Sequence, residues 1–300
     1  MNLKQQVPRP VKRWIRRQKP LFWFEQRRKY PPGRVQQHAP ITNLYHCTIH
    51  KAASQWLRAI FSDPRVFAHC GLRPYTYQRF WPSGHDERPL TARTFHKPFP
   101  AGTILTPLYL DYASYRTIPK PAAYRTLYVV RDPRDILVSW YYSQLHSHPT
   151  TGKTQATRDK LASLSFEDGL SYGIEHLHQL GTFAAIDSWA PPAGDTTNPE
   201  PILRLRYRDL IGPQKPQLLQ EIFDHSQISL PPGLLDDLLH DYSFSRLSGR
   251  QRGQENIQSH YRKGVADDWR DKLTAAHKAR LKPLIGQTLI KWQFETSLDW

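Results

Sequence analysis

The sequence predicts an α/β protein with a central, mostly parallel sheet flanked by helices, in a P-loop-like nucleotide-binding fold. Two short apolar runs, residues 44–47 and 126–130, are typical of buried strands, and each passes directly into a helical run. Lys51 lies in the loop after the first run. A strand, a tight loop and a helix start present backbone N–H groups to a phosphate, and a lysine there adds a mobile positive charge.

The first half of the chain alternates between predicted strands and helices, with one irregular stretch. The first strand, loop and helix occupy residues 43–61. Residues 62–102 are rich in proline and aromatic residues and have no sustained period, so we expect loops and short helices that cover an acceptor substrate. A second strand is expected at 103–106, and a helix at 109–118 that ends before Pro119.

The clearest strand, residues 126–130, is continuous, apolar and β-branched, as expected for a strand buried on both faces. Asp132 is a good N-cap, and Pro133 fits the first turn of the helix that follows. Arg131 therefore lies at the carboxyl end of a central strand, and Ser139 lies two turns along the helix. In open α/β sheets, ligands bind at this edge.

The second half of the chain is mostly helical. In order, we expect a polar loop at 150–160, one or two helices within 166–189, a loop at 191–201, a strand at 202–207, and helices at 216–224, 234–240 and 274–290. Thr274 is the expected N-cap of the last helix. His146 and His148 have no carboxylate or cysteine at ligand spacing, so we expect no metal site.

The composition favours anionic partners. The 300 residues carry a formal net charge of +16, with no apolar run long enough to span a bilayer and no apolar segment of a signal peptide. Cys47 and Cys70 do not suggest a disulfide framework, and Cys47 falls in a predicted buried strand, so we expect a reduced, cytoplasmic chain. We expect a basic arm at 1–40 and a single domain at 41–300.

The N-terminal arm is strongly basic. Between Lys4 and Arg34 there are eleven lysines and arginines and only one acid, Glu25. Apolar residues are interleaved with them, namely Trp14, Ile15, Leu21, Phe22, Trp23 and Phe24. Prolines break any long helix here, so we expect an extended or partly ordered arm. It is either a solvated tail or a surface that contacts a membrane or a nucleic acid.

The lysine loop differs from the nucleoside-triphosphatase pattern G-x-x-x-x-G-K-[ST]. The loop has no glycine before Lys51, and the next residue, Ala52, lacks the hydroxyl that would bind Mg²⁺. The loop therefore suits a phosphate-like group that is handled without a metal.

Three motifs, in order, resemble those of the sulfotransferases that use 3′-phosphoadenosine-5′-phosphosulfate (PAPS). The family's phosphosulfate loop, T-Y-P-K-S-G-T-T-W, is matched by Thr48 to Trp56 at Thr, Lys and Trp, with Ser54 in a threonine place. The second motif, R-[ND]-P-[KR]-D-x-x-x-S, fits Arg131 to Ser139 at every fixed position. The third, R-K-G-x-x-G-D-W-K, is met by Arg262, Lys263, Gly264, Asp268 and Trp269, while Asp267 and Arg270 depart from it. The resemblance covers about residues 43–275.

The resemblance implies a cofactor site with two anionic ends. The 5′-phosphosulfate end would be held by Lys51, Ala52, Ala53, Ser54, Gln55 and Trp56. The 3′-phosphate would be held by Arg131, Ser139, Arg262 and Lys263, with Gly264 allowing close backbone approach. Trp56 would stack against adenine, with Tyr207, Ser243 and Phe244 near the base. Lys51 would also stabilise charge on the leaving bridging oxygen.

Two departures from the family matter. Ala52 and Ala53 replace Ser and Gly, and an alanine at positive φ costs about 1 kcal/mol. Cytosolic members carry Lys-Thr-His after the second strand, and the corresponding place here, residues 106–109, has no histidine. His96 and Asp111 are therefore the candidate general bases. We expect His50 to shape the loop rather than to act as the base.

The resemblance implies a PAPS-dependent sulfotransferase that moves a sulfuryl group to a hydroxyl or amine without a metal. Two alternatives stay open: a catalytically altered, sulfotransferase-like binding protein, and a P-loop nucleotide kinase, against which the missing hydroxyl argues. The expected acceptor is a small molecule, a lipid or a glycan. A membrane-surface contact through the arm is a further option, and no nucleic acid is expected. The acceptor's identity and the oligomeric state are not encoded in these patterns.

Overall fold

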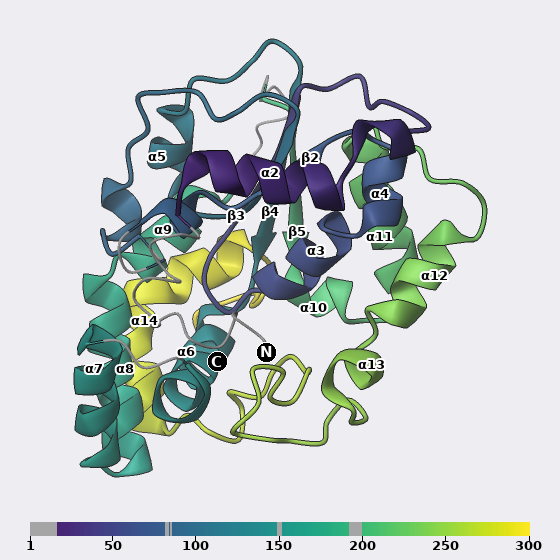
Figure 1. Ribbon diagram of the computed structural model, residues 1–300. Coiled ribbons are helices and arrows are strands. Elements are labelled where there is room, and N and C mark those ends of the chain that lie inside the picture. Colours follow the sequence, from purple (N-terminus) through teal and green to yellow (C-terminus); the bar gives the residue numbers. More distant parts are fainter. Residues whose placement is uncertain (1–16, 82–83, 85, 149–151, 192–199) are drawn as a thin grey trace, which may run out of the picture.

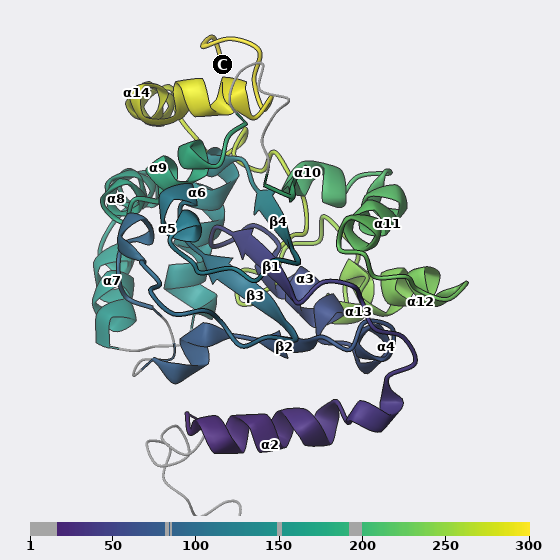
Figure 2. The same cartoon turned by 90° about the horizontal axis from the view of Figure 1, so that it is seen from above.

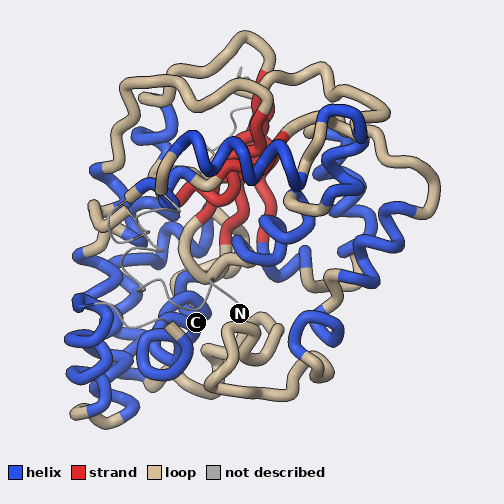
Figure 3. The backbone as a smooth tube through the Cα atoms, viewed as in Figure 1, coloured by secondary structure: helices blue, strands red, loops and turns tan. Residues whose placement is uncertain are grey.

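A five-stranded, all-parallel sheet forms the centre of the molecule, with helices on both faces (Figure 1, Figure 3). The computed structural model describes residues 17–81, 84, 86–148, 152–191 and 200–300. The strand order is β2-β3-β1-β4-β5. The strands are β1 (Asn43–Thr48), β2 (Arg73–Tyr75), β3 (Thr103–Tyr109), β4 (Tyr124–Val130) and β5 (Ile202–Arg206). This sheet confirms the predicted fold class.

Alternate residues of the central strands build two cores, one on each face of the sheet. Tyr45 and Tyr128 point into one core, and Leu44 and Leu127 point into the other. The first core is covered by α6 (Pro133–Tyr142), α8 (Phe166–Gln179), α9 (Thr182–Ser188) and α14 (Ala275–Lys291). The second is covered by α3 (Ser54–Phe61), α4 (Pro64–Ala68), α11 (Lys215–His225) and α12 (Leu234–Asp241).

Helices with a strong N-cap residue begin where the sequence predicts. The side chain of Asp132 accepts a hydrogen bond from the Arg134 amide at the start of α6. The side chain of Thr274 caps α14 in a capping box with His277. The remaining short elements are α5 (Tyr112–Arg116), α10 (Tyr207–Leu210), α13 (Phe244–Ser248), the 3₁₀ turns Pro32–Arg34, Tyr77–Phe80 and Leu90–Ala92, and the π-helical turn Ser143–Ser147.

The structure differs from the expected elements at three places. The expected polar loop at 150–160 is wrong, because α7 (Gly152–Ala162) is a helix that has almost no apolar stripe to reveal it. Strand β3 continues past Pro107 to Tyr109, so α5 starts three residues later than expected. The three-residue edge strand β2 was not expected, because it is too short to show a period.

The basic N-terminal segment contains a helix, α2 (Lys19–Lys29), which lies along the β2 edge of the sheet (Figure 2). Pro20 occupies its first turn, where no amide donor is required, so this proline starts the helix rather than breaking it. Residues 1–16 of the expected arm, and most of the expected 191–201 loop, lie outside the described residues. Among the described helices, none is long and apolar enough to cross a membrane.

A fully buried arginine ties α6 to the C-terminal segment. Arg134 pairs with Asp132 at 2.7 Å and with Glu295 at 2.7 Å. Its guanidinium lies 3.7 Å from the ring centroid of Trp269 and 4.6 Å from that of Trp300. Removal of this cation would leave two carboxylates without their partner in a largely buried place.

We therefore expect Arg134→Ala to lower the free energy of unfolding by about 3–5 kcal/mol. Urea denaturation of the full chain measures this change. Arg116→Ala, at an exposed position on α5, serves as the matched control and should change stability by less than about 0.5 kcal/mol. Equal effects of the two substitutions would contradict a structural role for the buried pair.

Candidate functional site

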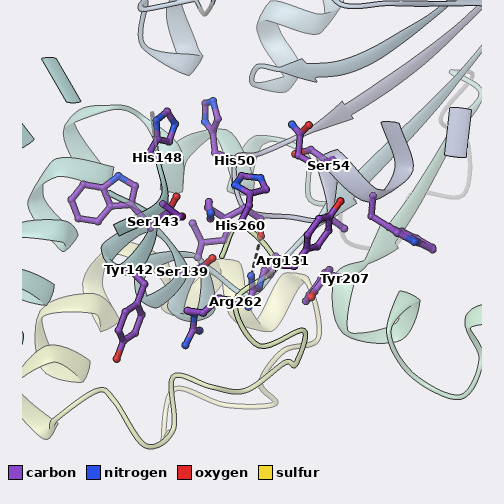
Figure 4. A pocket seen from close by; sticks show the side chains of 18 of the residues that line it. His50, Ser54, Arg131, Ser139, Tyr142, Ser143, His148, Tyr207, His260 and Arg262 are labelled. Atoms are coloured by element: carbon purple, nitrogen blue, oxygen red, sulfur yellow. Dashed lines mark hydrogen bonds between the residues drawn. The ribbon is translucent and has the colours of Figure 1, made fainter. Parts of the chain in front are cut away.

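A cavity of about 780 Å³ lies at the carboxyl ends of the central strands. The chain places β2 and β3 on one side of β1, and β4 and β5 on the other, so the connections change direction at β1. Ligands of open α/β sheets bind at such a switch point. Lys51 follows β1, Arg131 follows β4 and Tyr207 follows β5, and all three line the cavity. Figure 4 shows Arg131 and Tyr207.

The loop after β1 holds two residues in the left-handed region. Lys51 has φ 71°, and Ala53, the N-cap of α3, has φ 58° and ψ 10°. The strain expected for Ala53 is therefore present in the structure. The turn brings the first residues of α3, Ser54 to Trp56, to the cavity wall. The hydroxyl of Ser54 accepts a hydrogen bond from the Tyr109 hydroxyl at 2.8 Å.

Arg131 joins three parts of the site. Its Nη1 donates to the carbonyl of Lys51 at 3.1 Å, and its Nη2 donates to the carbonyl of Val265 at 3.3 Å. Its guanidinium lies 4.6 Å from the ring centroid of Tyr207. The fork geometry of arginine suits such bridging, and lysine could not reproduce it.

The segment around Gly264 is fixed by two acids. Asp268 pairs with both Arg262 and Lys263. Asp135, at the start of α6, accepts hydrogen bonds from the amides of Asp267 at 2.9 Å and Trp269 at 3.2 Å. Asp135 thus connects the second sequence motif to the third.

Gly264 needs to be glycine for two reasons. Its φ is +71°, a conformation that other residues rarely adopt. A Cβ there would also lie 2.5 Å from the Phe244 ring. The backbone of this segment therefore approaches the aromatic wall of the cavity more closely than any other residue would allow.

The cations of the site crowd one another. Burial, followed by the charges of Arg131 and Arg262, lowers the pKa of Lys51 to about 7. Burial, followed by the charges of Lys51 and His148, lowers the pKa of His260 to about 4. Asp135 shows the opposite effect, because burial raises its pKa to about 6 although Arg131 lies nearby. An anion bound among these cations would relieve the repulsion.

Most of the residues expected at a cofactor site line this one cavity. They are Lys51, Ala53, Ser54, Gln55, Trp56, Arg131, Ser139, Tyr207, Phe244, Arg262, Lys263 and Gly264. Two others do not line it: Ala52 is fully buried in the turn, and Ser243 is the N-cap of α13.

The structure does not bring either expected general base to the cavity. His96 is exposed on the loop before β3 and is not among the lining residues. Asp111 caps α5 by accepting a hydrogen bond from the Ser114 amide at 2.8 Å, and it is buried away from the cavity. A helix-capping role explains this aspartate without any chemistry.

Several lining residues were not anticipated from the sequence. The ring of His50 stacks on Tyr109 with centroids 4.0 Å apart and planes 20° apart. His148 and His260 point into the same part of the cavity (Figure 4). Such positions are set by packing between distant elements, so no local pattern reveals them. Within the described residues, no cluster of three or more potential metal-binding side chains occurs.

Comparisons with known proteins bear on this geometry. A family model described as "Sulfotransferase domain" matches residues 114–293, more than half of the chain. Dog sulfotransferase 1A1 is 23% identical over 170 residues, which is 52% of this chain and 52% of that protein, so the match spans about half the length of this curated relative. The crystal structure of mouse sulfotransferase SULT7A1 complexed with PAP superposes with a TM-score of 0.50, at 15% identity, over 84% of this chain and 85% of that one. That likeness supports the fold.

The left-handed alanine gives a direct test of the loop geometry. Ala53→Gly should raise the free energy of unfolding by about 0.5–1 kcal/mol, because glycine adopts positive φ without the Cβ clash. Chemical denaturation measures this change. Ala59→Gly, within the same helix, is the matched control and should cost about 1 kcal/mol. A loss of stability at both positions would mean that Ala53 is not left-handed in the protein.

Proposed function

The chain belongs to the sulfotransferase family, and we propose that it transfers a sulfuryl group from PAPS to a hydroxyl or amine of an acceptor without a metal. The observation that supports this most strongly is the bridge made by Arg131, which contacts the carbonyls of Lys51 and Val265. Through that bridge the three sequence motifs surround one cavity. The family model begins at residue 114, so support for the lysine loop comes from this geometry.

The residues present fit a ligand with two separate anionic groups. Lys51, Arg131, Arg262 and Lys263 all line the cavity. The buried Nε of Arg131 has no hydrogen-bond partner among the described residues, which leaves a donor for an anion. Because Gly264 has no Cβ, the backbone at this position could approach a phosphate closely. These features support the assignment of PAPS as the sulfuryl donor.

An aromatic part of the same cavity suits the adenine base. The Nε1 of Trp56 donates to the carbonyl of Tyr242 at 2.8 Å, which fixes the indole plane, and the ammonium of Lys215 lies 5.0 Å from its ring centroid. Phe244 and Leu247 also line this end. A flat base would stack here while the cations hold its phosphate groups.

Bound PAPS would supply an activated sulfuryl group, whose bond to the phosphate oxygen breaks as a bond to the acceptor oxygen or nitrogen forms. Lys51 would stabilise the negative charge that develops on that phosphate oxygen. The arginine-held loops would keep the donor in place, which is the main requirement of an in-line transfer. A nucleotide kinase is less well supported, because the residue after Lys51 is the apolar Ala52, fully buried in the turn.

We assign the general base to His50 rather than to His96 or Asp111. His50 is exposed to the cavity, directly precedes Lys51, and stacks on Tyr109 at the end of β3. The family resemblance implies a histidine after the corresponding strand, which residues 106–109 lack. His50 would instead supply the imidazole at the end of β3, to an acceptor hydroxyl in the same cavity.

The acceptor would occupy another part of the same cavity. Ile136, Trp140, Leu177 and Leu180 supply apolar surface to the cavity, and Gln78, Thr157 and Ser143 supply polar groups. This mixture supports an acceptor with an apolar body and a hydroxyl or amine, in the class of small molecules, lipids or glycans. Cys47 and Cys70 are both free and buried, which supports a reducing, cytoplasmic setting.

We expect the purified chain to release PAP from PAPS in the presence of a suitable acceptor, as followed by chromatography over a panel of phenols, alcohols, sugars and amines. His50→Gln should lower the transfer rate by about 100-fold or more while leaving the affinity for PAP unchanged, because the histidine acts on the acceptor. His96→Gln is the control and should transfer normally. Full activity of His50→Gln would refute the base assignment. PAP binding without transfer to any acceptor would favour the non-catalytic alternative.

PAP binding should weaken as the pH rises above 7. In the ligand-free protein the pKa of Lys51 is lowered to about 7, and a bound anion would raise this pKa. Below pH 7, Lys51 is charged in both the free and the PAP-bound protein. Above pH 7, Lys51 of the free protein is neutral and must take up a proton when PAP binds. Calorimetry at pH 8, in buffers of different ionisation enthalpy, should show net proton uptake. Lys51→Arg keeps its charge and should show none, and proton uptake equal to that of the parent would exclude Lys51 as the group that titrates.

A further inference from the structure

The exposed side of α2 carries positive charge that nothing in the described structure balances. Its exposed cations are Lys19, Arg27, Arg28 and Lys29, and no described acid forms an ion pair with any of them. The single acid of the helix, Glu25, is already paired with Arg79 at 2.6 Å. By contrast, α14 pairs Arg280 with Glu175 and Lys291 with Asp187.

The opposite side of α2 fixes the helix to the domain. Phe22 is buried and meets Tyr75 and Phe80 edge to face, with ring centroids 5.6 and 5.4 Å apart. Trp23 stacks on Tyr75. Arg79 lies 5.0 Å from the Phe22 ring centroid. These contacts hold the helix along the β2 edge with a defined side toward solvent, so its cations form a fixed surface.

An aromatic side chain projects from this same surface. Phe24 is 65% exposed, more than any other exposed large hydrophobic residue described. Leu21 lies three residues earlier in the helix and is only half-buried. Isolated exposed apolar residues are common, but a phenylalanine one helical turn from the unpaired Arg27 and Arg28 combines the two elements that interfacial helices use.

A further cation, Arg73 of β2, lies on the edge of the sheet beside the helix. Burial, followed by the charge of Arg27 on α2, lowers the pKa of Arg73. The β2 edge is therefore a concentrated positive surface without a described anionic partner.

We propose that this surface, the exposed side of α2, docks the protein on an anionic lipid bilayer. The cations bind acidic headgroups, and each adds to the free energy of binding as lysines and arginines next to a membrane do. Phe24 enters the boundary between headgroups and acyl chains, which accepts an aromatic ring. A duplex nucleic acid would engage the cations but would offer Phe24 no apolar environment, so a bilayer accounts for both features.

The test is co-sedimentation of the full chain with large vesicles of phosphatidylcholine alone, or containing roughly 30% phosphatidylserine. We expect binding only to the anionic vesicles. The double variant Arg27→Gln, Arg28→Gln should lower the partition coefficient at least about tenfold. Phe24→Ser should lower it several-fold, and this loss should persist at high salt, since it is not electrostatic. The matched control, Lys160→Gln with Arg246→Gln, removes two exposed cations from other helices and should bind as the parent does.

The other outcomes overturn the proposal. Equal binding to uncharged vesicles, or no binding to anionic ones, would exclude an anionic bilayer as the partner. An equal loss in the control variant would mean that the net charge of the whole chain acts, not this surface. Unchanged binding by Phe24→Ser, together with equally tight binding of a DNA duplex that the arginine variant loses, would identify a general polyanion surface. No cofactor or acceptor is used, so the result is independent of the proposed function.

Discussion

The hydrogen bonds of Arg131 are the interaction on which the rest of the site depends. One guanidinium binds the Lys51 carbonyl after β1 and the Val265 carbonyl near the C-terminal motif, and lies over Tyr207 after β5. The residues involved are far apart in sequence, and only the parallel sheet brings their strand ends to one edge. A rigid planar cation can satisfy several carbonyls in fixed directions, which makes the cavity one preformed site.

The same arrangement leaves the site electrostatically unbalanced without a ligand. Three acids pair with the cations of the motifs: Asp135 with Arg131, Asp268 with Arg262 and Lys263, and Glu255 with Arg262. No described acid forms an ion pair with Lys51. Burial lowers the pKa of Lys51, and the charges of Arg131 and Arg262 lower it further. A ligand with two anionic groups would restore the balance, so the charge pattern supports both the affinity for such a ligand and its orientation.

The sequence predicts the parts of this structure that local chemistry determines. Residues 44–47 of β1 and 126–130 of β4 are buried on both faces, and Asp132 and Thr274 cap helices through side chains close in sequence. Helix α7 is not predictable in this way, because packing rather than an apolar stripe holds it, with Leu161 as its buried residue. Strand β3 passes Pro107, a residue that usually ends a strand.

The site was partly predictable for the same reason. Its cations lie in short motifs that follow strands, so their sequence places them at the correct edge. The histidine is different: His50 reaches its position by stacking on Tyr109 of another strand, and no spacing in the sequence encodes that contact. His96 and Asp111 were chosen by proximity along the chain, which does not determine proximity in space.

The most direct test of this account is the calorimetric affinity for PAP in buffer without Mg²⁺, for the parent chain, for Arg131→Gln and for the exposed control Arg116→Gln. The account predicts micromolar binding by the parent and the control. It also predicts a loss of about tenfold or more for Arg131→Gln, since a charged hydrogen-bonding group and the loop bridge are both removed. Absence of PAP binding by the parent, or equal affinity of all three proteins, would contradict the claim that Arg131 assembles a PAPS site.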